Sequence, residues 1–204
     1  PLAKAGLFGN LIGIIAQTDL LEASIRMLDA GRIREKALSE IAHKDELTGL
    51  CNRRHFKTLF HSEFDRAKRF GGLLAFILLD IDHFKSVNDR HGHSAGDKVL
   101  REIATLIRQN VRPVDIVARY GGEEFAVLLP GLGTRAAALT AERIRTGVEA
   151  HSFRLSIGDI RVTISAGLCK LTEKHGNLTD MINEADKYLY RAKHSGRNRV
   201  MVAQ

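Results

Sequence analysis

The sequence predicts an α+β domain, in which strands paired in a sheet are covered by helices on one face. The first observation is an unbroken apolar run of strand length at residues 73–79. The second is the pair Gly121-Gly122 between two apolar runs, a hairpin signal because glycine accepts positive φ without a Cβ clash. Pairing through a hairpin, with amphipathic helical segments in between, favours an α+β layer over a doubly wound sheet.

The individual elements follow in chain order. Residues 73–79 lack any alternation of polar and apolar side chains, so we expect a strand that is buried on both faces. Residues 96–111 carry Val99, Ile103 and Ile107 at helical spacing, which predicts a helix with one buried stripe. The hairpin arms are expected at 116–120 and 124–129, followed by a helix at 134–150, a strand at 161–168 and a helix at 178–192.

Residues 1–41 differ from the rest of the chain, which we treat as one domain at 42–204. Their apolar residues repeat at alternating spacings of three and four, with Thr18 as the polar exception, as in a heptad seam: Leu11, Ile14, Leu21, Ile25 and Leu28. We predict an N-terminal signalling helix that pairs two chains as a coiled coil. The pattern is shorter than about three heptads, so an amphipathic helix that packs on its own domain is the alternative. A chain that begins at Pro1 also suggests a fragment or a processed form.

Composition narrows the classes of protein without choosing among them. The 204 residues carry a formal net charge of +7, which suits a protein that handles nucleotide polyphosphates or nucleic acid. The sequence has no Trp and no aromatic residues interleaved on a basic face, so we expect no nucleic-acid partner. Cys51 and Cys169 lack metal-ligand spacing and are expected to be free thiols in a reducing cytoplasm. No apolar run reaches the roughly 18 residues of a membrane span.

Two acidic clusters stand at the ends of the predicted strands. Asp80 and Asp82 follow the buried apolar run, and Glu123 and Glu124 follow the Gly-Gly pair. Carboxylates brought together at the end of a buried strand repel each other unless a cation neutralises them. Mg²⁺ takes hard oxygen ligands, often one or two carboxylates with substrate phosphates, so Asp80 and Glu123 predict a magnesium site. For the Gly-Gly-Glu-Glu turn alone, the alternative is an ordinary hairpin with solvated charges.

Five motifs in order resemble one protein family. They are Asp45-Glu46-Leu47-Thr48-Gly49-Leu50, Asp-x-Asp-x-Phe-Lys-x-x-Asn-Asp from Asp80, Gly-His-x-x-Gly-Asp from Gly92, Arg-Tyr-Gly-Gly-Glu-Glu-Phe from Arg119, and Ser195-Gly196-Arg197-Asn198. Together they resemble the GGDEF domain of bacterial diguanylate cyclases, in its GGEEF variant. Five ordered motifs are far more specific than any one of them. The resemblance covers roughly residues 42–202.

The resemblance implies a fold and a reaction. The fold is a palm-like, ferredoxin-related nucleotidyl cyclase core, with a central, mostly antiparallel sheet and flanking helices. The reaction condenses two GTP into cyclic di-GMP and releases two pyrophosphates, each ribose 3′-hydroxyl attacking the α-phosphorus of the other nucleotide. The implied cofactor is Mg²⁺, with two ions in each active site and Mn²⁺ as an alternative.

The resemblance also implies roles for individual residues. Asp80, the carbonyl of Ile81 and Glu123 match metal ligands, and Glu123 is also a candidate acceptor for the proton of the attacking hydroxyl. The other matched positions are phosphate-stabilising Lys85, the β- and γ-phosphate ligands Lys193 and Arg197, and the guanine-reading Asn88 and Asp97 with His93 nearby. We expect His83 to line the nucleotide cleft rather than to bind metal, because Mg²⁺ prefers oxygen. Glu124 either contacts the metal or is a carboxylate whose hydrogen bonds are satisfied within the turn, and the two alternatives are equal.

A regulatory site is also implied. Arg112-Pro113-Val114-Asp115 resembles the RxxD inhibitory motif of the family, and Arg143 matches a second contact. An arginine can grip guanine O6 and N7, or a phosphate, through two hydrogen bonds, and a nearby aspartate can accept from the guanine edge. We therefore expect feedback inhibition by cyclic di-GMP. The alternative is an Arg and an Asp that flank a proline turn.

The sequence thus predicts an active cyclase that uses GTP and is inhibited by its product. We expect a homodimer, because the product joins two nucleotides through two equivalent bonds. The alternative is a catalytically inactive GGDEF domain that serves as a receptor for GTP or cyclic di-GMP, although the intact acidic, basic and base-reading residues argue against it. We also expect an upstream sensor domain in the full-length protein and a cytoplasmic location, with membrane attachment through upstream segments as an alternative.

Overall fold

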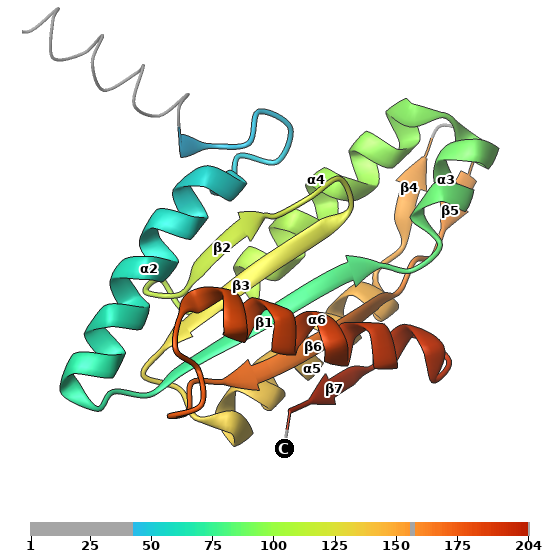
Figure 1. Cartoon of the computed structure of the whole chain (residues 1–204). Coiled ribbons are helices and arrows are strands. Elements are labelled where there is room, and N and C mark those ends of the chain that lie inside the picture. Colours follow the sequence, from blue (N-terminus) through green and yellow to red (C-terminus); the bar gives the residue numbers. More distant parts are fainter. Residues whose placement is uncertain (1–42, 156–157, 204) are drawn as a thin grey trace, which may run out of the picture. The chain divides into compact units, whose positions relative to one another are not determined.

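A five-stranded sheet forms the centre of the fold (Figure 1). The computed structural model describes residues 43–155 and 158–203, which belong to one unit, His43–Gln204. The strand order is β2-β3-β1-β6-β7. These strands are β1 Leu74–Ile81, β2 Ile116–Arg119, β3 Glu124–Pro130, β6 Ile164–Lys170 and β7 Val200–Val202. The predicted signalling helix at residues 1–41, with its heptad seam, lies outside the described residues.

β1 is the central strand, and all eight of its residues are buried. It pairs antiparallel with β3 on one side and with β6 on the other, so that Asp80 faces Glu124 and Ser165 across the two ladders. β2 extends the sheet as the other arm of the hairpin, whereas β7 runs parallel to β6. The predicted α+β fold with a mostly antiparallel sheet is confirmed.

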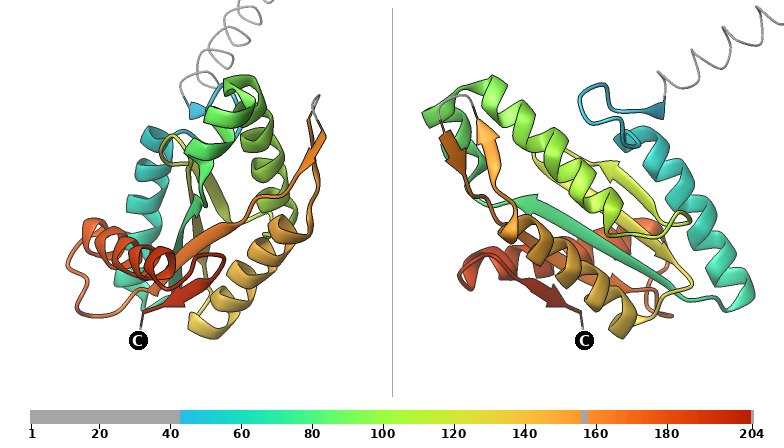
Figure 2. Two further views of the ribbon diagram at one scale, coloured as in Figure 1. Left: turned by 90° about the vertical axis from the view of Figure 1, so that its right-hand side faces the viewer. Right: turned by 180° about the vertical axis from the view of Figure 1, so that it is seen from behind.

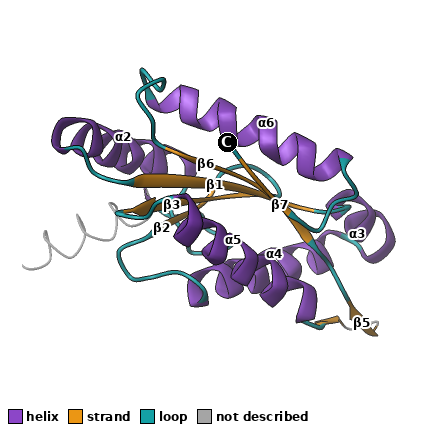
Figure 3. Cartoon of the chain, turned by 90° about the horizontal axis from the view of Figure 1, so that it is seen from below, coloured by secondary structure: helices purple, strands orange, loops and turns teal. Residues whose placement is uncertain are grey.

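Helices cover both faces of the sheet, where the sequence predicted cover on one face (Figure 3). The helices are α2 Arg53–Phe70, α3 Phe84–His91, α4 His93–Gln109, α5 Thr134–Ala150 and α6 Leu178–His194. Alternate residues of β1 enter two separate cores: Phe76 and Leu78 pack with α2 and α6, whereas Ile77 and Leu79 pack with α3, α4 and α5. A strand that is apolar on both faces needs a layer of helices on each, which explains the correction.

α2 is a helix that the sequence-based list of elements did not include. It begins after the N-cap Asn52, whose side chain accepts a hydrogen bond from the N–H of His55, and it ends at Gly71, which has a φ of 67°. Aromatic residues spaced four apart give it a buried stripe of Phe56, Phe60 and Phe64. The signal for a capped amphipathic helix was therefore present in the sequence.

α6 packs directly on the backbone of β6 at Gly167. A Cβ atom at this residue would lie 2.0 Å from the carbonyl oxygen of Ala185, so only glycine allows the contact. A capping box formed by Asn177 and Asp180 starts the helix. The close approach matters for the site, because the last turn of α6 carries Lys193 to the end of β1.

A second, two-stranded sheet is formed by β4 Phe153–Leu155 and β5 Gly158–Ile160 beside α4 (Figure 2). Some predicted bounds shift in this part of the chain. The strand expected at 161–168 begins instead at Ile164, because the preceding residues lead out of the small sheet. β1 also continues to Ile81, so Asp80 lies within the strand rather than after it.

No helix in the described part of the chain combines the length and the apolar character that a membrane span needs.

Candidate active site

The two acidic clusters meet where β1 ends against the hairpin. Asp80 is the antiparallel partner of Glu124, and the N–H of Ile81 donates to the carbonyl oxygen of Glu123 at 3.3 Å. Asp80 is only 5% exposed, and both glutamates are half-buried. Because the sheet register fixes the backbone of both strands, three carboxylates are held in one small region.

The turn that carries Glu123 is closed by Tyr120 and Gly121, whose N–H groups donate to the carbonyl oxygen of Glu124 at 2.8 and 3.2 Å. Neither glycine of this turn has a positive φ, which corrects the reason expected for the Gly-Gly pair. Gly121 instead leaves space for the side chain of Glu124. A Cβ atom there would lie 2.5 Å from Oε2 of Glu124, whereas one at Gly122 would meet nothing within 4 Å.

Arg119 fixes the conformation of the turn. Its Nε and Nη2 donate to the carbonyl oxygen of Gly122 at 3.1 and 2.8 Å, and its Nη1 lies 3.3 Å from Oδ2 of Asp45. Although burial opposes it, the hydrogen bonds from Thr48 and the charge of Arg119 lower the pKa of Asp45. The ionised carboxylate of Asp45 therefore fixes the side chain of Arg119, which in turn fixes the backbone of the Gly121-Gly122 turn.

A cleft of about 190 Å³ opens beside the carboxylates. It brings together six residues singled out from the sequence: Asp80, Ile81, Lys85, Glu123, Lys193 and Arg197. His83, expected to line a nucleotide cleft, lies here as well, with a left-handed φ of 58° at the N-cap of α3. Nζ of Lys193 lies 2.7 Å from Oδ2 of Asp80, so one cation is already paired with this buried carboxylate.

Burial and mutual repulsion disfavour the ionised forms of these acids. Burial raises the pKa of Asp80 in spite of the opposing hydrogen bond and charge of Lys193. Burial, and after it the charge of Asp80, raises the pKa of Glu123 and that of Glu124. A single ammonium group therefore does not neutralise the cluster, and further positive charge in the cleft would stabilise it.

The donor set fits a hard divalent cation. Asp80 and Glu123 offer carboxylate oxygens, and Ile81 also lines the cleft. Within residues 43–155 and 158–203, no three His, Cys, Asp or Glu side chains gather closely enough to hold a metal by themselves. A cation here would also need the carbonyl, water or phosphate oxygens. That requirement suits Mg²⁺, which usually keeps several ligands from outside the protein.

The oxygens of Asp82 are occupied by the protein itself. They accept hydrogen bonds from the hydroxyls of Thr163 and Ser165, each at 2.7 Å, and from the N–H of Asn198 at 3.0 Å. Asp82 is 4% exposed. We infer that this carboxylate anchors the loop after α6 and does not serve as a ligand.

Asn198 fastens that loop to α5 as well. Its side chain accepts from Nη1 of Arg145 at 2.9 Å and donates to Oε1 of Glu149 at 2.6 Å. Arg197 and Asn198 have left-handed φ values of 60° and 45°, which are costly for residues with a Cβ. The hydrogen bonds of Asn198 offset this strain and hold Arg197 at the cleft.

The three residues matched to guanine recognition lie outside this cleft, where α3 meets α4. Asn88 reaches across to α4 and covers Gly96, since a Cβ atom there would lie 1.9 Å from its Oδ1. Asp97 follows directly in the chain and is half-buried, whereas His93 is exposed in the first turn of α4. A glycine at this position thus lets the Asn88 amide reach the part of α4 that carries Asp97.

The RxxD residues form an internal ion pair. Asp115, whose side chain is 1% exposed, accepts from the N–H of Arg112 at 2.8 Å and from its Nη2 at 2.6 Å. Nη2 of Arg112 also donates to the carbonyl oxygen of Pro130 at 2.9 Å. Arg143 donates from Nε and Nη2 to the carbonyl oxygen of Asn110, at 3.2 and 2.6 Å. Asp115 therefore orients Arg112, and both guanidinium groups lie at the surface.

Comparison with known proteins identifies the family. A family model described as "Diguanylate cyclase, GGDEF domain" matches residues 42–199. The chain belongs to this GGDEF-domain family. Recognition of the family from five short motifs is thereby confirmed.

Named relatives show how far the likeness extends. Diguanylate cyclase DgcP from Pseudomonas aeruginosa is 44% identical over 172 residues, which are 83% of this chain and 24% of that protein. The structure of the coiled coil and GGDEF domain of DgcB from Caulobacter crescentus, in complex with c-di-GMP, is 32% identical with a TM-score of 0.85, covering 90% of this chain and 97% of that one. The active GGEEF domain of a diguanylate cyclase from Vibrio cholerae is 35% identical with a TM-score of 0.72, covering 76% and 98%. This chain spans only 24% to 46% of the length of three curated relatives.

Some residues within the GGDEF motifs have structural roles that the sequence did not reveal. From the sequence, Asp45, Arg119 and Asn198 are only parts of motifs and Asp82 only a neighbour of Asp80, with no role of their own. Arg119 holds the backbone of the turn beside Glu123, and Asp45 orients Arg119. Asp82 and Asn198 hold the loop that carries Arg197. Their position inside an ordered motif was the available signal, but their partners lie too far along the chain to be read from spacing.

The crowding of carboxylates predicts that Glu123→Gln stabilises the protein in the absence of divalent cations. Removing one repelling charge should raise the free energy of unfolding by about 0.5 kcal/mol near neutral pH, because the site is partly solvated. The thermal midpoint should rise by roughly 1–2 °C. Because the pKa of Glu123 is higher in the folded state than in the unfolded state, the wild type loses stability as the pH rises through the folded-state pKa. The gain should therefore disappear in acid, where Glu123 is protonated in both states.

The control is Glu173→Gln, which changes an exposed glutamate outside the cluster and should leave the midpoint unchanged. Calorimetric scans of the three proteins with a chelator, at neutral and acidic pH, measure the effect. A lower midpoint for Glu123→Gln near neutral pH would contradict the interpretation that its charge is unfavourable in the free protein.

Proposed function

We propose that this GGDEF domain is a diguanylate cyclase of the GGEEF type, which condenses two GTP into cyclic di-GMP and releases two pyrophosphates. The observation that carries the proposal is the single cleft in which Asp80 and Glu123 lie together with Lys85, Lys193 and Arg197. Carboxylates combined with cations are what a nucleoside triphosphate and its metal require. The likeness to the active GGEEF domain from Vibrio cholerae supports the proposal.

In this proposal the cations of the cleft hold the triphosphate. Lys193 rests on Asp80 but is 32% exposed, so its flexible side chain can turn to a phosphate oxygen. Arg197 would bind the same phosphates from the strained loop that Asn198 anchors. Lys85, exposed near the start of α3, would stabilise the negative charge that develops on the reacting phosphate.

Asp80, the carbonyl of Ile81 and Glu123 are the proposed ligands of Mg²⁺, with two ions in each active site and Mn²⁺ as an alternative. Bound there, the metal would supply charge neutralisation for the phosphates and a more acidic 3′-hydroxyl. Glu123 is the proposed acceptor of the hydroxyl proton. Its raised pKa, caused first by burial and then by Asp80, makes it a stronger base than an ordinary glutamate.

Asn88 and Asp97, with His93 nearby, are the proposed guanine-reading residues. A carboxylate accepts well from N1 and N2 of guanine, whereas adenine offers no such pair of donors. The Asn88 amide is held against Gly96, and both face the same helix junction as Asp97. Discrimination between purines would therefore come from α3 and α4, while chemistry takes place at the end of β1.

Two such domains would work as a homodimer. The described residues place Asp80 and Glu123 in one cleft, but the product contains two nucleotides joined by two equivalent bonds, so the clefts of two domains must face each other. An upstream sensor domain would control the pairing in the full-length protein, and the cytoplasm, where GTP is available, is the proposed location. The sequence-based expectation that residues 1–41 supply the pairing helix is part of this proposal.

Feedback inhibition would act through Arg112, Asp115 and Arg143. The exposed guanidinium groups of Arg112 and Arg143 are suited to guanine or phosphate oxygens of cyclic di-GMP. Asp115 would contribute mainly by fixing the orientation of Arg112, because its carboxylate is buried in their ion pair. The binding of c-di-GMP by DgcB, to which this chain is similar, supports a product site without locating it.

Incubation of the protein with GTP and Mg²⁺ should yield cyclic di-GMP and pyrophosphate, identified by mass, at a rate per chain that rises with protein concentration. Glu123→Gln should lower the rate by roughly a hundredfold or more, because it removes a metal ligand and the proton acceptor together. GTP that stays unreacted at every protein concentration, yet binds, would instead support the receptor function.

Gly96→Ala should impair guanine recognition without unfolding the domain. The new methyl group would displace the Asn88 amide, so the KM for GTP should rise by roughly three- to tenfold. Alanine is otherwise the better helix former, and thermal stability should stay close to that of the wild type. Gly72→Ala, where a Cβ atom meets only an ordinary contact at 3.6 Å, is the control. An unchanged KM in a folded Gly96→Ala protein would refute the assignment of Asn88.

Arg143→Ala should weaken the binding of cyclic di-GMP by roughly tenfold and relieve product inhibition. It is a cleaner test than Arg112→Ala, which would leave the buried carboxylate of Asp115 unpaired and destabilise the fold. Arg135→Ala, a change of the same type at an exposed position on the same helix, should keep the wild-type affinity. Calorimetric titration that gives equal affinity for all three proteins would exclude Arg143 from the product site.

A further inference from the structure

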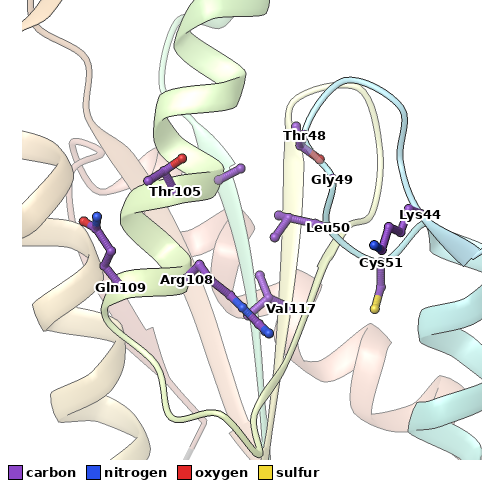
Figure 4. A pocket seen from close by; sticks show the side chains of 10 residues that line it. Lys44, Thr48, Gly49, Leu50, Cys51, Thr105, Arg108, Gln109 and Val117 are labelled. Atoms are coloured by element: carbon purple, nitrogen blue, oxygen red, sulfur yellow. The ribbon is translucent and has the colours of Figure 1, made fainter. Parts of the chain in front are cut away.

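A second pocket lies between α4, β2 and the loop at residues 44–51 (Figure 4). Its volume is about 460 Å³, inside the range of about 300–1,000 Å³ that is typical of small-molecule sites. Leu50, Ala104 and Val117 supply apolar surface. None of the residues assigned to GTP, to the metal or to the product lines this pocket, so the proposed function does not account for it.

The charged residues that line the pocket, Lys44 and Arg108, are both cations. Figure 4 shows Arg108 reaching from α4 toward Val117. Among the residues that the structure describes, none accepts a hydrogen bond or forms an ion pair with the Arg108 guanidinium. The acid of the neighbouring loop, Asp45, is already held by Thr48 and Arg119. The charge of Arg108, which no described residue neutralises, therefore favours an anion in the pocket.

The hydroxyl groups of the pocket cannot donate to such an anion. Oγ1 of Thr48 donates to Oδ1 of Asp45 at 2.7 Å, and Oγ1 of Thr105 donates to the carbonyl oxygen of Arg101 at 3.0 Å. A hydroxyl has one hydrogen, so both groups can only accept from a ligand. Recognition of the anion falls mainly on Arg108, whose planar guanidinium matches two oxygens of a carboxylate or a phosphate.

The wall of the pocket is joined to the turn that carries Glu123. The N–H of Cys51 donates to the carbonyl oxygen of Val117, and the N–H of Arg119 donates to the carbonyl oxygen of Cys51, at 3.2 and 3.0 Å. The guanidinium of Arg119 then holds the carbonyl oxygen of Gly122. A ligand that moves the loop or β2 would therefore act on the turn through short, directed contacts.

We propose that this pocket binds a small organic anion, an oxyanion on a compact apolar body, and that its occupant is sensed at the Gly121-Gly122 turn. The oxyanion pairs with Arg108, and the apolar body lies on Leu50 and Val117. Phosphate monoesters and carboxylates share this chemistry. The inference goes beyond the proposed cyclase function and needs neither GTP nor cyclic di-GMP for its test.

The test uses the full chain labelled with ¹⁵N and titrated with phenyl phosphate in one arm and benzoate in the other. Saturable shifts of the amide signals of Leu50 and Val117 are expected in at least one arm, accompanied by smaller shifts of Gly121 and Gly122. A response to phenyl phosphate alone identifies phosphate monoesters as the ligand class, and a response to benzoate alone identifies carboxylates.

Arg108→Gln should weaken the binding of the probe by roughly tenfold, because it removes the charge and the bidentate donor. Arg101→Gln makes the same change at an exposed position on the same helix that does not line the pocket, and it should bind as the wild type does. Equal affinity in Arg108→Gln and the wild type, or shifts confined to residues 193–198 of the catalytic cleft, would overturn the binding site. Saturation of the pocket with no change at Gly121 and Gly122 would overturn the link to the turn.

Discussion

Repulsion among three carboxylates at the end of β1 is the constraint on which the rest of the site depends. Asp80, Glu123 and Glu124 cannot move apart, because the β1–β3 ladder and the closed hairpin hold their backbones. Burial adds to the repulsion by removing water that would screen it. The ion pair between Lys193 and Asp80 offsets part of this energy and leaves the two glutamates with raised pKa values. In the proposed function, this arrangement would be completed by a cation and a polyphosphate.

Backbone contacts hold the positively charged side chains of Lys193 and Arg197 at the cleft. α6 approaches β6 closely at Gly167, and this contact helps to place Lys193 beside Asp80. The loop after α6 keeps two left-handed residues only because Asn198 is bonded to Asp82 and to α5. Strain of this kind persists where surrounding structure over-determines it, and here it holds a guanidinium at the cleft.

The β2–β3 hairpin connects the parts of the domain that we interpret as functional. Its turn carries Glu123, β2 begins directly after the Arg112–Asp115 pair, and the backbone of Cys51 is hydrogen-bonded along its edge. Arg119 joins the turn to the loop at residues 44–51 through Asp45. A small displacement of this hairpin would alter the distance between carboxylates, on which the affinity for a cation depends. Regulation by a second ligand is physically reasonable at such an element.

The sequence by itself determined what depends on near neighbours: the apolar run of β1, the hairpin, the bounds of α5, the acidic clusters and the order of the motifs. It gave the wrong reason for Gly121, because the contact with the Glu124 carboxylate is a matter of side-chain packing and not of local φ. Only the tertiary structure decided that Lys193 pairs with Asp80 and that Asp82 is bonded to Asn198, 116 residues away. Partners so far apart are chosen by sheet register and by the packing of helices on both faces, which no local pattern encodes.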